Sequence, residues 1–420
     1  MKFIHAADVH LDSPLQGLDR YDGAPVEKMR RATRRALENL VDLCIDERAT
    51  FLLIAGDLYD GDWRDYNTGL FFVSQMGRLA SAGVEVFLIK GNHDAQSQIS
   101  KTLRLPDGVH DLSTKAPVTI QLDGPRIAIH GQGYSEREIT CDLSAAYPPP
   151  VRGYVNIGLL HTAAGGREGH ANYAPCTPLG LTHKGYDYWA LGHVHQREIL
   201  QQDPWIVFPG NLQGRHARET GAKGASIVTV DDGRIASVEH RPLDVVRWAR
   251  ARIDLSNARS SDDALEAVSE ALSRAQLDAE GRPLAIRITL TGASKAHAAI
   301  VRAADHFKSE VRALGTHVEG GGVWIEKIEV STRPQQESRE SRAATTEGPI
   351  GDLLRALRDT REDDAELLKM AAELKELKLP DKLLMLDPTL DFQNLESIKQ
   401  AIDGAESMLL SHLLGTAEEA

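Results

Sequence analysis

Five short clusters of aspartate, asparagine and histidine are the residues of this sequence best suited to catalysis. They are Asp-Val-His at 8–10, Gly-Asp-Leu-Tyr-Asp at 56–60, Gly-Asn-His-Asp at 91–94, a histidine at 161 and Gly-His-Val-His at 192–195. Each follows an apolar run, and any one of them alone would more often be an ordinary turn. Together they offer oxygen and imidazole ligands and no thiolate, which favours one metal site over five unrelated turns.

The chemistry that this set of residues indicates is hydrolysis assisted by two metal ions. Mixed oxygen and imidazole ligands suit Mn²⁺, Fe²⁺ or Zn²⁺ better than Ca²⁺. Two such cations about 3.5–4 Å apart repel each other, and a carboxylate shared between them offsets the repulsion. One aspartate must therefore lie centrally, and Asp57 is the candidate. A water held by such a pair loses a proton near neutral pH and can attack phosphorus in line.

The elements that must position these clusters alternate in type along the first half of the chain. Helices are predicted at 27–48 and 67–82. Strands are predicted at 2–7, 51–55, 84–89, 126–130, 154–160, 186–191, 205–208 and 225–230. The clusters fall at the carboxyl ends of strands, the edge where α/β sheets bind ligands. This order predicts an α/β sandwich of packed sheets flanked by helices.

A second pattern begins near Arg247. Strand-like runs at 249–255, 284–290 and 322–330 alternate with helical patterns at 261–275 and 295–314, with Ser261 as an expected N-cap. They predict a small α+β module of the βαβαβ type. A polar stretch and a leucine-rich helical region follow, the latter with breaks near Pro380 and Pro388. The expected divisions are a catalytic domain at 1–245, the module at 246–332, a linker at 333–349 and a helical region at 350–420.

Composition limits the classes of function. The chain has 420 residues and a formal net charge of -13, so any contact with nucleic acid must be local or assisted by metal ions. Its three cysteines are widely spaced and form no Cys-x-x-Cys, which argues against a disulfide framework. The first residues are typical of a strand and not of a signal peptide, and no apolar run reaches about 18 residues. A cytoplasmic location is expected.

The five clusters, in this order, resemble the motifs of the calcineurin-like metallophosphoesterase superfamily over about residues 1–241. The resemblance assigns Asp8, His10, Asp57 and His195 to one metal and Asp57, Asn92, His161 and His193 to the other. It leaves His93 to act on the substrate, by stabilising the transition state or protonating the leaving oxygen. Asp60 matches the position that pairs with this histidine in many members. Some nuclease relatives have histidine there, and the alternative for Asp60 is a loop carboxylate facing water.

Two further stretches narrow the resemblance to one branch. His-Ala-Ala-Asp-Val-His-Leu-Asp-Ser-Pro-Leu at 5–15 and the segment 208–224 resemble the DNA-repair exonucleases, the SbcD-like and YhaO-like proteins. In that branch a capping module follows the catalytic domain, and a helical C-terminal region docks on an SMC-like coiled-coil ATPase. The resemblance implies a DNA phosphodiesterase, an exonuclease that could also cut internally, with Mn²⁺ as the expected metal. At the positions of Asp60 and Asp94, protein phosphatases of the superfamily usually have different sequence motifs, which argues against the phosphatase branch.

Several assignments remain alternatives at this level. Arg215, His216 and Arg218 are candidate contacts for substrate, because they follow a strand end near the metals. The basic cluster at 28–40 is more typical of a solvated helix face, with Arg34 and Glu38 paired at i,i+4. The helical region could instead pack as a hairpin on its own protein.

Related nucleases suggest a homodimer through helices 27–48 and 67–82. Competing functions are a phosphodiesterase for small nucleotides or phosphorylated metabolites, and a scaffold with a vestigial site. The role of Asp94 is open.

Overall fold

The computed structural model describes residues 1–13, 31–60, 66–96, 104–166, 173–317, 322–335, 348–375 and 395–415. The chain forms two compact units. The first comprises Met1–Ala249 together with Ala279–Ala285, and the second comprises Arg250–Asp278 together with Ile286–Ala420.

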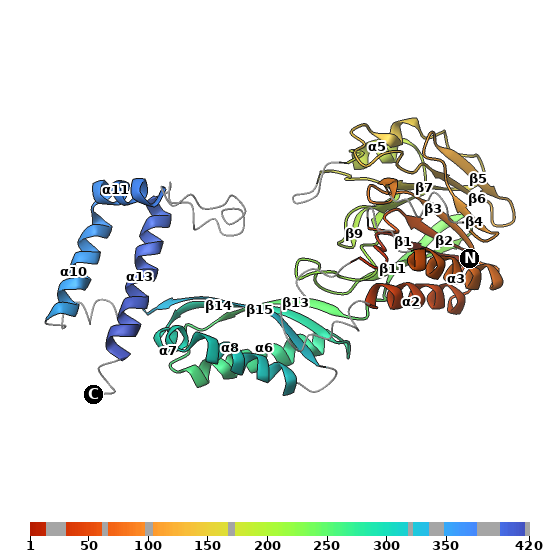
Figure 1. Ribbon diagram of the computed structural model, residues 1–420. Helices are drawn as coiled ribbons and strands as arrows, with labels where there is room; N and C mark the ends of the chain where they lie inside the picture. The colour runs from red at the N-terminus through yellow and green to blue at the C-terminus, as the bar shows by residue number, and fades with distance from the viewer. Residues whose placement is uncertain are drawn as a thin grey trace. The chain divides into compact units, whose positions relative to one another are not determined.

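The first unit contains two sheets of six strands each (Figure 1). The first sheet has the order β12-β11-β1-β2-β3-β4, and the second has the order β5-β6-β7-β8-β10-β9. Strands of the first sheet are β1 (Lys2–Ala6), β2 (Phe51–Ala55), β3 (Glu85–Ile89), β4 (Val109–Asp111), β11 (Gly224–Asp231) and β12 (Arg234–Pro242). Strands of the second are β5 (Val118–Leu122), β6 (Ile127–Gly131), β7 (Val155–His161), β8 (Tyr188–Gly192), β9 (Glu198–Gln202) and β10 (Trp205–Phe208).

Each sheet has a parallel centre, and this determines where the site can lie. Strands β1 to β4 run parallel to one another, as do β6, β7, β8 and β10. Strands β2, β7 and β8 are buried along their whole length, as expected of parallel strands covered on both faces. Within each parallel set, all carboxyl ends therefore meet at one edge.

Apolar layers hold this sandwich together. Phe3, Phe51 and Ile157 belong to one buried cluster that joins the facing sides of the two sheets. On the outer side of the first sheet lie α2 (Ala32–Asp46) and α3 (Tyr66–Ser81), with Leu40 and Cys44 in their shared core. The outer side of the second sheet carries the short helices η3 (Leu143–Ala146) and α5 (Pro178–His183). The predicted α/β sandwich flanked by helices is confirmed.

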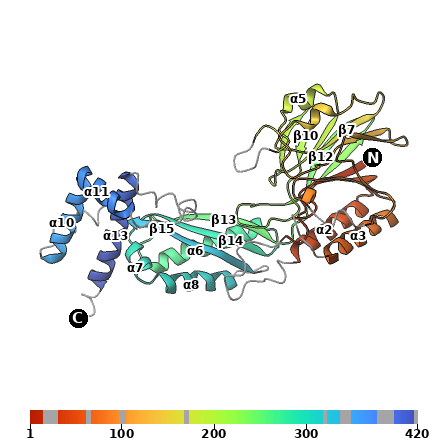
Figure 2. The ribbon, with the colours of Figure 1, turned by 45° about the horizontal axis from the view of Figure 1, so that its top comes forward.

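The second unit has a three-stranded sheet in the order β13-β14-β15, formed by Arg247–Asp254, Leu284–Ser294 and Val323–Pro334. Helices α6 (Ser261–Asp278) and α8 (Ala304–His317) lie along one side of it (Figure 2). The helix predicted at 295–314 is in fact two, because α7 (His297–Arg302) ends at Ala303. The predicted N-cap is also wrong: the hydroxyl of Ser260, and not that of Ser261, accepts from the backbone of Asp263 at 3.1 Å.

Three helices follow in the described part of the C-terminal region: α10 (Pro349–Glu362), α11 (Asp364–Lys375) and α13 (Leu395–Gly415). Leu367, Ile398 and Ile402 form a small core between α11 and α13, and α13 also contacts α7. Most of the predicted linker and the breaks near Pro380 and Pro388 lie outside the described residues, so the division into four parts stays a prediction. Among the helices that the structure describes, none has the length and apolarity to cross a bilayer.

The predicted ion pair between Arg34 and Glu38 on α2 is wrong. Arg34 instead donates two hydrogen bonds to Asp12, at 2.7 and 2.6 Å, and its guanidinium lies 5.0 Å from the centre of the Phe71 ring. Glu38 pairs with Arg35 at 2.8 Å. Arg34 thereby ties the loop after β1, which carries site residues, to the two helices beneath it.

Replacing Arg34 with methionine should lower the free energy of unfolding by about 2 kcal/mol, because the Asp12 carboxylate loses two charged hydrogen bonds. Urea denaturation followed by circular dichroism measures the change. Arg35→Met is the matched control, because the exposed pair with Glu38 contributes less than about 1 kcal/mol. Equal losses in the two variants would contradict this role of Arg34.

Candidate dimetal active site

The five sequence clusters meet where the parallel strands of both sheets end. Asp8 follows β1, Asp57 follows β2 and Asn92 follows β3, while His161 is the last residue of β7. His193 follows β8 directly. Backbone hydrogen bonds join the first two loops, from Asp8 N to Gly56 O and from His10 N to Asp57 O, both at 3.0 Å. Backbone hydrogen bonds alone therefore hold these two loops of the first sheet together.

Three glycines allow the loops of the two sheets to approach closely. A Cβ on Gly192 would overlap the carbonyl oxygen of Ala55, and one on Gly91 would overlap the carboxylate of Asp57. Gly56 has φ +89 and lies against the ring of His161. Any larger residue at these places would push the ends of β2, β3 and β8 apart. The glycines of the sequence clusters thus serve packing, while their neighbours serve chemistry.

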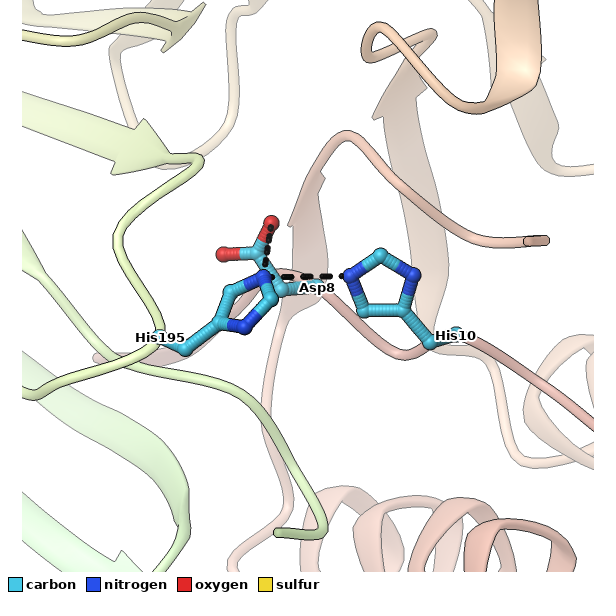
Figure 3. A group of neighbouring side chains, drawn as sticks. All are labelled: Asp8, His10 and His195. Atoms are coloured by element: carbon cyan, nitrogen blue, oxygen red, sulfur yellow. Dashed lines mark hydrogen bonds and ion pairs between the residues drawn. The ribbon is translucent and has the colours of Figure 1, made fainter. Parts of the chain in front are cut away.

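One group of side chains that could hold a metal ion consists of Asp8, His10 and His195 (Figure 3). The Nε2 atoms of the two histidines are 3.2 Å apart, and Nε2 of His195 is 3.9 Å from Oδ1 of Asp8. Asp8 and His10 are fully buried. The three side chains come from loops of different sheets and converge on one point.

A second group consists of Asp8, Asp57 and His161. Asn92 lies beside it, with Oδ1 at 3.0 Å from Nε2 of His161 and at 3.3 Å from Nδ1 of His193. Oδ2 of Asp57 is 3.5 Å from Nε2 of His161 and 3.9 Å from Nε2 of His10 in the first group. Asp8 belongs to both groups, and Oδ2 of Asp57 lies within 4 Å of a histidine of each group.

The hydrogen bonds of two histidines determine which ring nitrogen faces the site. Nδ1 of His161 donates to the carbonyl oxygen of Ala55 at 2.9 Å, and Nδ1 of His195 donates to Oε1 of Glu219 at 2.6 Å. In a neutral imidazole this leaves the lone pair on Nε2, the atom that points into the site in both residues. Both rings are thus oriented as metal ligands usually are.

Burial and charge in the site fit a divalent cation. Burial raises the pKa of Asp8, and the charge of Asp57 raises it further. Burial also lowers the pKa of His10 and of His161, so both imidazoles are neutral at pH 7. A cation would favour the charged form of the buried Asp8 carboxylate, and neutral imidazole is the form that binds a metal. The donor set therefore suits Mn²⁺, Fe²⁺ or Zn²⁺.

Four residues of the site have a strained backbone. Asp8, His10, Asp57 and His193 have φ of 50, 44, 51 and 102°, in the left-handed region that side chains disfavour. Such a conformation costs about 1–3 kcal/mol for each residue and persists where the surrounding structure imposes it. Here the two sheets and the three glycines impose it.

His93 contacts a carboxylate outside the two groups above, that of Asp60. Its Nδ1 lies 2.8 Å from Oδ1 of Asp60, whose Oδ2 accepts from the hydroxyl of Ser13 at 2.6 Å. Burial would lower the pKa of His93, but the hydrogen bond to Asp60 and the charge of Asp57 raise it overall. Burial would raise the pKa of Asp60, but the hydrogen bonds from His93 and Ser13 lower it to about 2. The pair therefore favours a charged imidazole next to the metal groups.

Asp94 braces two of the loops. Its carboxylate accepts backbone N–H groups of Leu58 at 3.0 Å, Tyr59 at 2.8 Å and Gly91 at 3.0 Å. It thereby ties the loop after β2 to the turn after β3, and these loops carry Asp57 and Asn92. The residue type alone could not indicate this, because an aspartate after a strand suits many turns.

The turn after β10 brings two of its three predicted substrate residues to the site. The guanidinium of Arg215 lies 3.7 Å from Asp60 and 3.2 Å from Glu219, and Nε2 of His216 lies 3.6 Å from Glu219. Arg218 is exposed, and its backbone N–H donates to Nδ1 of His216 at 3.2 Å. Sequence analysis missed Glu219 and Ser13, although Glu219 stands in the segment 208–224 that pointed to the nuclease branch.

Known families match two parts of the chain. Calcineurin-like phosphoesterase matches residues 1–197, and Metallophosphoesterase YhaO, middle domain, matches residues 248–333. The uncharacterized metallophosphoesterase YhaO of Bacillus subtilis is 35% identical over 296 residues, covering 70% of this chain and 72% of that protein. The DNA double-strand break repair protein Mre11 of Methanopyrus kandleri is 27% identical over 405 residues, covering 87% and 84%.

Solved structures with similarity to this chain include TT1561 of Thermus thermophilus and a dimetal phosphatase from Danio rerio. The first is 16% identical with a TM-score of 0.34 and covers 57% of this chain and 98% of its own. The second is 12% identical with a TM-score of 0.36 and covers 58% and 96%.

Fold, side-chain groups and family match together define a calcineurin-like metallophosphoesterase, a class of phosphoester hydrolases that use a dimetal site. Within that class, the chain belongs to the family of the metallophosphoesterase YhaO.

Replacing Asp94 with alanine should lower the free energy of unfolding by about 3 kcal/mol, because three buried backbone N–H groups lose their acceptor. Chemical denaturation measures it. Asp111→Ala is the control, since Asp111 is partly exposed and its carboxylate pairs with Lys90 at 3.4 Å. A loss below about 1 kcal/mol for Asp94→Ala would show that the loops hold without this brace.

Proposed function

We propose that this metallophosphoesterase is a DNA phosphodiesterase, an exonuclease of DNA repair that works with two metal ions, expected to be Mn²⁺. The observation that carries the proposal is the place of the Asp57 carboxylate near a histidine of each metal-binding group, with the His93–Asp60 pair beside them. Similarity to a relative named as a DNA double-strand break repair protein supports DNA as the substrate.

The proposed ligands divide between two cations around Asp57. One cation would take Asp8, His10, Asp57 and His195, and the other would take Asp57, Asn92, His161 and His193. When bound, the cations would polarise the phosphodiester and lower the pKa of the attacking water. Oδ1 of Asp57 accepts the backbone N–H of His93 at 2.9 Å, which orients Oδ2 toward His10 and His161. The turn that carries His93 thus fixes the direction of the Asp57 carboxylate.

His93 and Asp60 act on the substrate in this proposal. Asp60 holds Nδ1 of His93, which leaves Nε2 to give a proton to the leaving oxygen. The side chain of His93 is 32% exposed, so a phosphodiester can reach it from solvent. Arg215, His216 and Arg218 are the proposed substrate side of the site. With a net charge of -13, the protein must attract DNA through this turn and the cations.

Two partners complete the proposal. Helices α10, α11 and α13 are proposed to dock on an SMC-like coiled-coil ATPase, and the exposed Leu368, Met408 and Leu409 support an apolar interface there. A homodimer through α2 and α3 is supported by Tyr66 and Leu70, which are 63% and 61% exposed one helical turn apart on α3.

Replacing His93 with glutamine should leave two metal ions bound and reduce cleavage of end-labelled linear DNA about 10²–10⁴-fold, because the general acid is lost. Cleavage is measured with Mn²⁺, Fe²⁺ or Zn²⁺, each with and without a candidate ATPase. Plasma emission analysis counts the metal ions bound per chain. His110→Gln is the matched control, since His110 pairs with Glu85 on β4 and β3. Asp57→Ala should lose both metals.

Near wild-type cleavage by His93→Gln would refute the role of His93. If wild-type protein cleaves bis(p-nitrophenyl) phosphate or cyclic nucleotides but not DNA, the substrate is a small phosphodiester and the DNA proposal is wrong.

Replacing Leu70 with glutamate should convert a dimer to a monomer at micromolar concentration, because a charge replaces an apolar contact at the proposed interface. Analytical ultracentrifugation measures the mass. Leu179→Glu is the control, because Leu179 is equally exposed but lies on α5. A monomeric wild-type protein would contradict the dimer.

A further inference from the structure

A series of ion pairs and hydrogen bonds connects the substrate side of the site to one proposed metal ligand. His93 contacts Asp60 at 2.8 Å, and Asp60 faces Arg215 at 3.7 Å. Arg215 contacts Glu219 at 3.2 Å, and Glu219 accepts from His195 at 2.6 Å. Arg215 is the only cation of this series that is permanently charged, and it stands at its centre.

The guanidinium of Arg215 divides its two terminal nitrogens between two carboxylates. Nη1 faces Oδ2 of Asp60 and lies 3.5 Å from the hydroxyl of Ser13, while Nη2 faces Oε1 of Glu219. Nη2 is also 3.4 Å from Nδ1 of His195, which is a second donor to the same oxygen. A planar fork can hold two carboxylates at a fixed separation, and a lysine ammonium cannot do so equally well.

Glu219 is anchored so that one oxygen is left for these two donors. Its Oε2 accepts from Nδ2 of Asn211 at 2.9 Å and from the backbone N–H of Arg215 at 2.7 Å. Its Oε1 is then directed at His195 and at the guanidinium. A carboxylate that accepts from the remote nitrogen of a ligand histidine sets the orientation of the ring and raises its basicity.

We infer that Arg215 is a positioning residue, which holds Asp60 against His93 and Glu219 against His195, and not chiefly a contact for the DNA phosphate. The inference rests on the proposed two-metal function of this site. The side chain of Arg215 is 14% exposed, and its two terminal nitrogens already face carboxylates. Arg218, three residues further on, is exposed, so a phosphate can reach it from solvent.

The two possible roles of Arg215, as a positioning residue and as a substrate contact, predict opposite changes in metal affinity when its side chain is removed. Removing a positive charge near two cations should tighten metal binding if charge alone matters. Removing a positioning residue should weaken it, because His195 loses its orientation. Isothermal titration of the full-length, metal-free protein with Mn²⁺ measures both binding events without any turnover.

In Arg215→Gln we expect one of the two Mn²⁺ binding events to weaken about 10–100-fold and the other to stay within about threefold. We expect kcat on DNA to fall about 10–100-fold with little change in KM. Arg218→Gln is the matched control, because it removes the same charge from the same turn. It should raise KM and leave both Mn²⁺ affinities at the wild-type level.

Arg215→Lys is the second variant, in case Arg215→Gln does not fold. It keeps the positive charge and removes only the planar guanidinium group. Weaker binding of one Mn²⁺ is expected here too. Unchanged or tighter Mn²⁺ binding in both Arg215 variants, with a raised KM alone, would overturn the inference and make Arg215 a substrate contact. Equal weakening in Arg218→Gln would also overturn it.

The proposed function fails independently of this inference. A wild-type protein that binds two Mn²⁺ but leaves DNA uncut refutes the DNA substrate, while the Mn²⁺ titrations still decide the role of Arg215.

Discussion

The constraint on which the rest of the structure depends is the burial of two carboxylates, Asp8 and Asp57, at the seam between two sheets. Both side chains are almost completely removed from water, and burial together with the charge of Asp57 raises the pKa of Asp8. Hydrophobic packing alone would not place them there. A protein that keeps such a pair needs a positive partner at the same point, and the neutral imidazoles around them leave that part to a cation.

The fold meets this constraint by concentrating rigidity around the pair. The sheets contribute parallel strands whose buried residues admit little movement, and the loops that leave the first sheet are joined by backbone hydrogen bonds. Glycines at 56, 91 and 192 remove the side chains that would separate these loops. Asp94 then joins two of the loops a second time. The left-handed backbone at the site is therefore imposed by many weak restraints acting together.

Sequence reasoning succeeded where residue type and strand periodicity carry the information. β2 and β10 were predicted to the residue. The seven proposed metal ligands were chosen because aspartate, asparagine and histidine recur after apolar runs, and the structure brings their side chains close together, while their role as ligands stays a proposal. It failed where a contact joins distant segments. By its spacing, Arg34 could pair with Glu38 on the helix surface. The carboxylate of Asp12, 22 positions away along the chain, instead accepts two hydrogen bonds from Arg34. Strands β4, β5, β9 and β12 escaped detection because they are short or only partly buried, so their apolar pattern is weak.

Glu219 shows why the residues around the ligands are harder to find than the ligands. Nothing in its type or spacing distinguishes it from a surface glutamate, and it becomes informative only once His195, Asn211 and Arg215 are seen around it. The same surroundings bear on how an acidic protein would attract the proposed DNA substrate. The charge of Arg215 is offset by its two carboxylates, so the positive potential that a phosphate would meet would come mainly from the proposed cations. Under the proposed function, metal occupancy and substrate affinity would be thermodynamically linked, since each cation that binds would strengthen the attraction of the site for a phosphodiester, and the phosphodiester would in turn hold the cation.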